Sequence, residues 1–374
     1  MLHAILLTDV YFPFVCGVTK VIKIFTEELP RYGIKTTIVA PKSIKEAYVF
    51  RKDGRVNTFF VKSLRLLSIY PDVKTPEPLS TFFVASLLLK NFGFSNGEYI
   101  IHAHSPYMVT SMLRLRAKIC RRKLPLLLTY HTITEEYIKN RFGWLKVFLS
   151  RLDGVFMGDL MDKLKAIIIP TNYAGKKLIS HIPRHFGILR KKLIRIPNPL
   201  SRKDYETPSK SAHDYFDFIE DLEYAIWVGR ISHEKNLGYL IRIFRRIPYK
   251  LVIVGGGPLE ERLRSIAPKN VVFTGFVDAT MLRSLLKSAR CFVVANSFDN
   301  MPLAVMEAMA QGVPVISYHE GGHNEYIIHK KNGFIFRNIY EAREYITKIF
   351  KSDDLREEMG GCLLYTSPSP RDRG

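Results

Sequence analysis

Residues 291–317 read CFVVANSFDNMPLAVMEAMAQGVPVIS. The apolar run Cys291–Ala295 has the length of a buried strand, and Pro302–Gln311 has the periodicity of a helix. A second short apolar run follows at Pro314–Ser317. Strands that alternate with helices are typical of parallel sheets, so this stretch predicts one strand–helix–strand unit of an α/β fold.

The same alternation extends through both halves of the chain. Around the quoted stretch we expect strands at 225–228, 250–254 and 271–274, and helices at 237–246 and 280–287. The first half adds strands at 3–8, 36–40, 99–103, 126–130, 166–170 and 193–197, and a helix at 18–29. The pattern predicts two doubly wound, Rossmann-like domains that face a cleft, with ligands outside the carboxyl ends of the strands.

The boundary between the two domains is expected near residue 203. Residues 201–218 are polar and charged and contain Pro208, which is typical of a linker. The expected domains are therefore 1–203 and 204–361. The last stretch, 362–374, looks like a translated sequencing adapter, so we expect it to form no part of either domain.

Composition excludes several classes of protein. The chain has 374 residues, of which 47% are hydrophobic, enough to bury the cores of about two domains. Its longest apolar stretch, Leu79–Leu89, is shorter than the roughly 18 residues that a membrane span needs. We expect no signal peptide, because the first residues run straight into a strand, and four irregularly spaced cysteines indicate no disulfide framework or metal pattern. We expect a cytoplasmic protein.

The net charge of +21 is confined to the first half. Residues 1–203 contain 34 Lys and Arg against 13 Asp and Glu, whereas residues 204–374 contain 22 of each. An excess of Lys and Arg on one domain indicates an anionic partner, either a membrane surface or a nucleic acid. A basic surface that only contacts water would give the same excess. No nucleic-acid-binding signature accompanies the charge, so we expect no nucleic-acid partner.

Charged residues follow two of the expected strands in the second half. Arg230 and Lys235 stand five residues apart between a strand and a helix, a position that suits a diphosphate. Asp299 lies in a loop after a strand, and Glu307 lies on the next helix among apolar neighbours. A buried carboxylate needs partners, which sugar hydroxyls or backbone groups would supply. Amides at the start of the same helix suit phosphate oxygens.

Taken together, residues 225–334 resemble the donor domain of glycosyltransferase family 4. The resemblance makes Arg230 and Lys235 the pair that binds the diphosphate. It also matches Asp299 and Glu307 to the two family glutamates separated by seven residues, with Asp in the first position. The resemblance assigns donor binding to a further set of residues: Gly229, Gly275, Phe276, Asn300, Met301, Pro302 and Leu303.

The first half shows three matching segments. Residues 11–18, with Gly17, are similar to the family's N-terminal loop, in which glycine lets amides approach phosphate. Residues 102–106 resemble the acceptor-side histidine segment and give His104 an active-site role. Residues 129–137 look like the members that glucosylate diacylglycerol, which implies acceptor-side roles for His131, Glu135 and Tyr137.

The resemblance implies a GT-B fold and a retaining hexosyltransferase that needs no cofactor and no essential metal. His104, Arg230, Lys235 and Asp299 are the expected catalytic residues, and UDP-glucose is the expected donor. The C-terminal helix that crosses back to the first domain in the family is expected to be missing here. Basic residues between 114 and 151, interleaved with apolar ones, favour a peripheral protein on the inner face of the cytoplasmic membrane.

Several alternatives stay open. The acceptor is expected to be a membrane lipid such as diacylglycerol, but a soluble sugar, a polyprenyl-linked glycan or phosphatidylinositol would suit the same chemistry. A sugar epimerase with two Rossmann-like domains would leave Arg230, Lys235 and the segment from Asp299 to Glu307 unexplained. A basic nucleic-acid or anionic-surface binder without catalysis would explain the charge alone.

Overall fold

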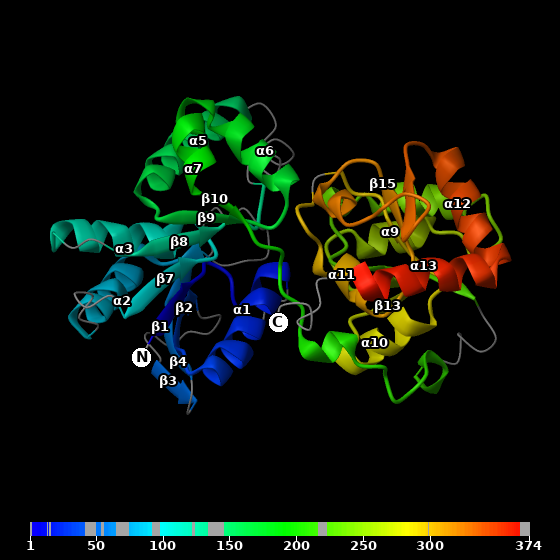
Figure 1. Ribbon diagram of the computed structural model, residues 1–374, viewed down its shortest axis with the longest axis horizontal. Coiled ribbons are helices and arrows are strands. Elements are labelled where there is room, and N and C mark those ends of the chain that lie inside the picture. The colour runs from blue at the N-terminus through cyan, green and yellow to red at the C-terminus, as the bar shows by residue number, and fades with distance from the viewer. Residues whose placement is uncertain are drawn as a thin grey trace. The chain divides into compact units, whose positions relative to one another are not determined.

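The computed structural model describes residues 2–12, 14, 16–41, 50–53, 56–64, 75–91, 98–121, 124–133, 146–215, 223–297 and 299–366. The chain divides into two compact units, Met1–Pro199 (unit 1) and Leu200–Gly374 (unit 2). Each unit contains one large, mostly parallel sheet with helices on its faces (Figure 1). The predicted fold class, α/β with two Rossmann-like domains, is confirmed.

The sheet of unit 1 has the strand order β10-β9-β8-β7-β1-β2-β4-β3, and all of its neighbouring pairs are parallel except β3 with β4. Its strands are β1 (His3–Leu7), β2 (Lys35–Pro41), β3 (Phe50–Asp53), β4 (Val56–Val61), β7 (Tyr99–Ala103), β8 (Leu126–Thr129), β9 (Ala166–Ile169) and β10 (Leu193–Arg195). A separate antiparallel pair is formed by β5 (Ser63–Leu64) and β6 (Thr75–Pro76).

The helices of unit 1 are α1 (Gly17–Glu28), α2 (Pro78–Asn91), α3 (Met108–Ile119), α5 (Lys146–Lys163), α6 (Asn172–His181) and α7 (Phe186–Lys192). Short 3₁₀ turns are η1 (Leu29–Tyr32) and η3 (Pro183–His185). Because side chains alternate along a strand, β1 sends Ala4 and Leu6 into a cluster with α1. Its Ile5 and Leu7 enter the larger cluster on the other face.

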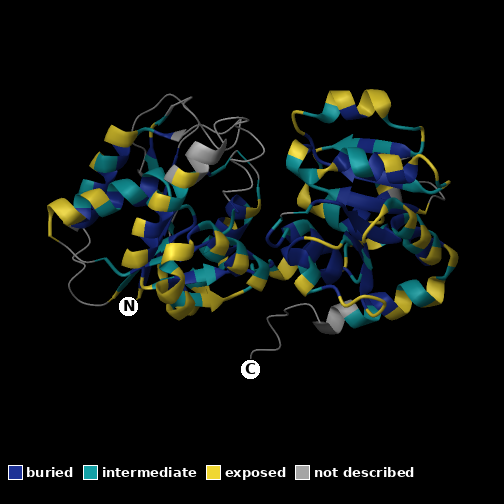
Figure 2. Ribbon diagram, turned by 90° about the horizontal axis from the view of Figure 1, so that it is seen from above, coloured by how far each residue is buried: buried dark blue, intermediate teal, exposed yellow. Residues whose placement is uncertain are grey.

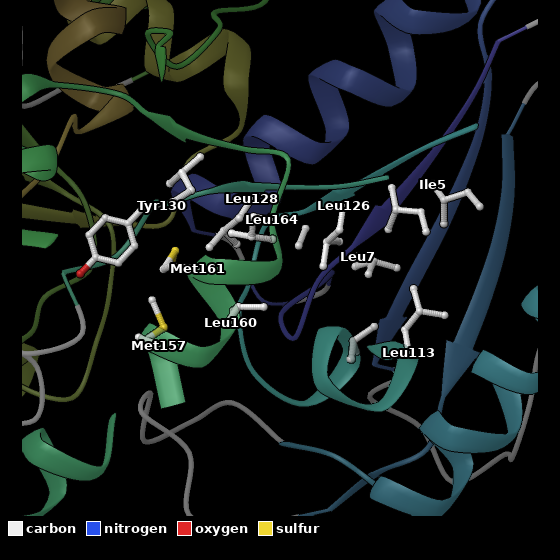
Figure 3. Packing of buried hydrophobic residues seen from close by; sticks show 14 of the residues in the cluster. Ile5, Leu7, Leu113, Leu126, Leu128, Tyr130, Met157, Leu160, Met161 and Leu164 are labelled. Carbon is white, nitrogen blue, oxygen red and sulfur yellow. The ribbon is translucent and has the colours of Figure 1, made fainter. Parts of the chain in front are cut away.

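Figure 3 shows part of that larger cluster from close by. Leu126 and Leu128 of β8 belong to it together with Met157 and Leu160 of α5. Leu113 of α3 joins the cluster from a third element. The central strands are therefore held by buried apolar contacts on both faces of the sheet.

The sheet of unit 2 has the all-parallel order β13-β12-β11-β14-β15-β16. Its strands are β11 (Tyr224–Val228), β12 (Lys250–Val254), β13 (Val271–Gly275), β14 (Cys291–Val294), β15 (Val315–Tyr318) and β16 (Gly333–Phe336). This is the order of a doubly wound fold, in which the strand order reverses between β11 and β14.

The helices of unit 2 are α8 (Leu237–Phe244), α9 (Glu260–Ile266), α10 (Ala279–Ser288), α11 (Leu303–Ala310), α12 (Ile339–Lys351) and α13 (Asp353–Thr366). The 3₁₀ turns are η4 (Arg202–Tyr205), η5 (Ala212–Asp214), η7 (His233–Lys235) and η8 (Gly322–Glu325). One face of the sheet packs on α8, α9 and α12, and the other packs on α10 and α11. The strands are buried and the outer helix faces are exposed (Figure 2).

The polar segment after residue 200 is bound to unit 2 and does not hang free as a linker. Gln311 Nε2 donates a 2.6 Å hydrogen bond to the carbonyl of Asp204, and Ser284 Oγ donates a 2.7 Å bond to the carbonyl of Lys210. Ala212 is fully buried in the core. The described part of the segment predicted as a linker therefore belongs to unit 2, which polarity alone does not reveal. The expected boundary at 203 lies four residues beyond Pro199.

Candidate functional site

Both sheets have a position where the strand order reverses, and the predicted site residues gather there. In unit 2 the reversal lies between β11 and β14, and Arg230 and Asp299 lie in the loops that follow these strands. In unit 1 it lies between β1 and β7, which are followed by the Gly17 loop and by His104, respectively. Ligands of open α/β sheets bind at such positions.

Two glycine-containing loops are joined at the carboxyl edge of unit 2. The amide of Gly229 donates to the carbonyl of Val254 at 3.0 Å, and the amide of Ile231 donates to the carbonyl of Gly256 at 3.0 Å. Gly255 has a φ of +120°, and a Cβ there would lie 2.0 Å from the carbonyl oxygen of Gly229. Only glycine permits this approach, which sets the position of the loop that carries Arg230.

Lys235 and Asp299 form an ion pair across the strand reversal, with Lys235 Nζ donating to Asp299 Oδ2. Their side chains are only 19% and 17% exposed, respectively. Lys235 ends the turn η7, and its neighbour Asn236 donates a 3.3 Å bond from Nδ2 to the carbonyl of Ala295 just after β14. Two residues far apart in sequence, both predicted for the site, are thus in direct contact.

The segment from Asn300 to Glu307 leads into α11. Asn300 and Met301 are buried, Pro302 caps the helix in an extended conformation, and Leu303 is the first helical residue. Pro302 was predicted inside the first turn and lies one residue before it. Glu307 is 6% exposed and lies on a helix whose other residues are all apolar. The start of α11 therefore lies at the same edge of the sheet as Asp299.

Gly275 and Phe276 lie at the end of β13. Gly275 has a φ of +73°, and the Phe276 side chain is largely exposed. A Cβ on Gly256 would lie 2.7 Å from this ring, so the ring lies over the glycine turn after β12. An exposed aromatic face beside a glycine turn is suited to stacking on a planar ligand.

Two buried polar side chains near the ion pair were not among the predicted site residues. His323 lies in η8, and Asn296 follows β14. Each is 1% exposed, and neither has a hydrogen-bond partner for its side chain among the residues that the structure describes. Burial lowers the pKa of His323 to about 4, with smaller effects of opposite sign from Asp299 and Lys235. Both residues stand inside matched segments of the sequence, but nothing in the sequence signals their burial.

Three histidines form a cluster at the carboxyl edge of unit 1. His104 Nδ1 and His131 Nε2 share a 2.9 Å hydrogen bond, and His102 Nε2 lies 2.7 Å from Thr129 Oγ1. Burial lowers the pKa of His102 to about 4 and that of His131 to about 3. Burial and the two neighbouring histidines hold the pKa of His104 well below its usual range. All three rings are therefore neutral at pH 7.

His104 is predicted for the active site and His131 for the acceptor side, and the two rings make different contacts. His104 is buried, and its Nε2 has no hydrogen-bond partner among the described residues of the chain. A neutral imidazole with one nitrogen fixed and the other without a described partner can orient a hydroxyl group that comes into contact with it. His131 fixes the orientation of the His104 ring. Glu135 and Tyr137, the other acceptor-side predictions, lie outside the described residues.

Asp9, which was not among the predicted site residues, holds the loop that follows His104. Its carboxylate accepts a hydrogen bond from Ser105 Oγ and from the amides of Met108 at 3.1 Å and Val109 at 2.8 Å. Burial raises the pKa of Asp9, and these hydrogen bonds oppose the shift. The residue joins the loop after β1 to the start of α3. An acid so soon after the first strand was the available signal.

Gly17 is the first residue of α1, and a Cβ there would meet nothing within 4 Å. The amide of Cys16 donates to Thr19 Oγ1 at 2.9 Å, which caps the helix locally. Open space at the start of a 12-residue helix is compatible with the predicted contact to a phosphate group. This role of Gly17 stays a prediction.

The basic segment 114–151 is described only in part. Arg114 pairs with Asp159 at 2.9 Å, and Arg116 Nε donates to Ser86 Oγ at 2.7 Å. These two guanidinium groups therefore have partners within unit 1. The side chains between Phe142 and Leu149 lie outside the description. In the part of the chain that is described, no helix combines the length and the apolar character that crossing a membrane requires.

Two family models cover most of the chain. "Glycosyltransferase Family 4" matches residues 15–202, and "Glycosyl transferases group 1" matches residues 211–361. The two matches fall on units 1 and 2, respectively, apart from three residues at the boundary.

Curated relatives include an alpha-monoglucosyldiacylglycerol synthase of Streptococcus pneumoniae, 24% identical over 96% of this chain and 81% of the relative. A sulfoquinovosyl transferase of Arabidopsis thaliana is 28% identical over 67% of this chain. An uncharacterized glycosyltransferase of Methanocaldococcus jannaschii is 36% identical over 30% of it. The last two matches span 49% and 32% of the relatives' own lengths.

Solved structures share the fold at low sequence identity. The sucrose-phosphate synthase of Thermosynechococcus elongatus has a TM-score of 0.74 at 16% identity, covering 98% of this chain and 94% of that one. Anabaena HepE in complex with UDP-glucose has a TM-score of 0.72 at 15% identity, with coverage of 98% and 94%. With the family models and the two Rossmann-like sheets, these matches show that the chain belongs to glycosyltransferase family 4 and has the GT-B fold.

Proposed function

We propose that this glycosyltransferase is a retaining hexosyltransferase that moves glucose from UDP-glucose to a membrane lipid, with diacylglycerol as the acceptor. The observation that carries the donor side is the Lys235–Asp299 pair at the strand reversal of unit 2, beside the start of α11. Cations and helix amides favour a diphosphate, and carboxylates favour sugar hydroxyls. These groups meet at one edge of the sheet.

The proposed mechanism depends on stabilising the departing diphosphate. Within unit 2, Arg230, Lys235 and the start of α11 bind its oxygens. Fixed donors aimed at developing charge lower the barrier without a general base of shifted pKa. The acceptor hydroxyl attacks from the face that the diphosphate leaves, so the sugar retains its configuration. As the bond between the anomeric carbon and the phosphate oxygen breaks, the hydroxyl proton passes to that departing oxygen. No essential metal takes part.

The neutral state of His104 supports an orienting role at the acceptor side. Its pKa lies well below the usual value, so at pH 7 the ring carries no charge and its Nε2 can hydrogen bond to a hydroxyl.

The choice of acceptor is supported by the names of two relatives. They are the alpha-monoglucosyldiacylglycerol synthases of Streptococcus pneumoniae and Acholeplasma laidlawii, which are 24% and 22% identical over nearly all of this chain. The positive charge of residues 1–203 favours binding to the inner face of the cytoplasmic membrane, where anionic lipids attract basic surfaces.

The experiment measures UDP release from UDP-glucose with liposomes that contain diacylglycerol and an anionic lipid. We expect release that depends on the liposomes, and a loss of about 10²–10³-fold in turnover for Lys235→Ala. Lys348→Ala is the matched control, because that lysine is exposed on α12 and pairs with Glu344 away from the site. Equal turnover of Lys235→Ala and wild type would refute the assignment of the diphosphate site.

Sedimentation of the protein with the same liposomes tests the membrane part separately. We expect the bound fraction to fall as the salt concentration rises, because a basic surface binds anionic lipid electrostatically. UDP release without binding to liposomes would support the donor assignment but contradict the lipid acceptor, and a soluble sugar would then be the acceptor to test.

A further inference from the structure

His323 is a buried histidine whose role the proposed reaction leaves unexplained. It is 1% exposed, and neither ring nitrogen has a hydrogen-bond partner among the described residues. Its ring lies against the backbone of Gly321, where a Cβ would come within 2.3 Å of the ring carbon Cε1. Buried polar groups without partners are rare because each one weakens the folded state, so one that is retained calls for an explanation.

The position of His323 links it to the Lys235–Asp299 pair. The amide of Gly322, the residue before the histidine, donates a 2.8 Å hydrogen bond to the carbonyl of Asp299. The charges of Asp299 and Lys235 both act on the ring of His323. Among the described residues, Lys235 is the ion-pair partner that the structure gives Asp299. The backbone contact of Gly322 with Asp299 brings the next residue, His323, into the same region, and its ring nitrogens are not used by any described residue.

Binding of a donor would change the partners of Asp299. This step rests on the proposed function, in which Lys235 binds the diphosphate of the nucleotide sugar. When Lys235 turns to the diphosphate, the Asp299 carboxylate loses its cation in surroundings where its side chain is only 17% exposed. A carboxylate left without a partner at such a site is costly, and a nearby N–H group would offset part of that cost.

We propose that His323 is a positioning residue that donates a hydrogen bond to Asp299 once the donor's diphosphate has drawn Lys235 away. The ring then holds the carboxylate toward the sugar hydroxyls while the lysine is occupied. In the free protein the two ring nitrogens are buried and have no partner among the residues that the structure describes, which weakens the fold. In the complex the new hydrogen bond offsets that cost.

The test compares UDP and UDP-glucose binding, measured by titration calorimetry, in wild type, His323→Leu and His323→Gln. We expect His323→Leu to weaken binding about tenfold, since a hydrogen bond to a charged group contributes at least that factor. His323→Gln retains an N–H donor and is expected to recover most of the affinity. The melting temperature of His323→Leu should equal or exceed that of wild type, because the variant removes a buried polar group without partners.

A double-mutant cycle with Asp299→Asn separates this role from a structural one. A neutral amide does not need the second donor, so His323→Leu should have little further effect in the Asp299→Asn background. His319→Gln is the control, since His319 is exposed on the same segment. If His323→Leu binds UDP and UDP-glucose as tightly as wild type does, the proposed role of His323 is refuted and the proposed function is not affected. A wild-type chain that binds no nucleoside diphosphate would overturn the proposed function and, with it, the role of His323.

Discussion

The histidine cluster of unit 1 predicts a loss of stability in mild acid. His102, His104 and His131 are held neutral by burial, with pKa values far below the roughly 6.5 expected in the unfolded chain. Because the folded pKa of each base is lowered, stability is fully present above about pH 6.5. It falls as the pH drops from there toward 3–4, where the folded protein also begins to take up protons.

The size of the effect follows from the proton balance. At about pH 5.5 each unfolded histidine is about nine-tenths protonated while the folded ring stays neutral, which costs about 1.4 kcal/mol per histidine relative to about pH 8. Three histidines give a loss of roughly 4 kcal/mol, or about a thousandfold in the opening equilibrium. The result depends little on the folded pKa values, provided that they lie well below about 5.5.

Hydrogen–deuterium exchange of peptides that cover β7 and β8 measures this loss, because the cluster lies on these strands and just after them. After correction for intrinsic rates, protection should fall about a thousandfold between about pH 8 and pH 5.5. His131→Asn should reduce that fall to about a hundredfold, whereas His233→Asn, an exposed site in unit 2, should not change it. Equal pH dependence in wild type and His131→Asn would contradict this explanation.

Three further substitutions test other parts of the structure. Gly255→Ala places a Cβ 2.0 Å from the Gly229 carbonyl oxygen at a φ of +120° and should destabilise unit 2 by about 1–3 kcal/mol or more. Gly238→Ala is the control, because this position in α8 has open space and alanine there should raise stability by about 0.5–1 kcal/mol. Thermal melts of the two variants measure the difference. Arg290→Leu removes a buried guanidinium that pairs with the exposed carboxylates of Glu223 and Asp353 and donates to the carbonyls of Ile349 and Phe350. It should cost about 1–3 kcal/mol in urea unfolding, mainly because these carbonyls lose their donor, and an unchanged free energy of unfolding would contradict this. Asp9→Ala removes the acceptor for the first amides of α3 and should lower stability by about 1–2 kcal/mol. It should also reduce sugar transfer, because Asp9 holds the loop that follows His104. Unchanged transfer would show that His104 does not depend on Asp9.

Most of the central strands could be predicted because their apolar runs are short and bounded. Tyr99–Ala103 and Lys250–Val254 coincide with β7 and β12, and the quoted stretch 291–317 contains β14, α11 and most of β15. The edge hairpin β3–β4 was missed, since edge strands mix polar and apolar residues and lack a continuous apolar run. The helices α12 and α13 after the last matched motif were also left without a prediction.

The candidate site was predictable where a motif names the residue and not where only three-dimensional packing does. Lys235 and Asp299 stand 64 residues apart, yet both were predicted and they are in contact. Asp9 had a local signal, an acid directly after the first strand, but its role at the start of a distant helix depends on packing, and so does the burial of His323. The hydrogen bonds that hold the polar segment after residue 200 to unit 2 depend on packing in the same way.

The most direct test of the proposed reaction is the transfer of radiolabelled glucose from UDP-glucose into liposomes that contain diacylglycerol. We expect label in the organic phase as an α-linked glucolipid, with the label lost in Lys235→Ala. Label that stays entirely in the aqueous phase, at every salt concentration and with every nucleotide sugar, would contradict the proposal.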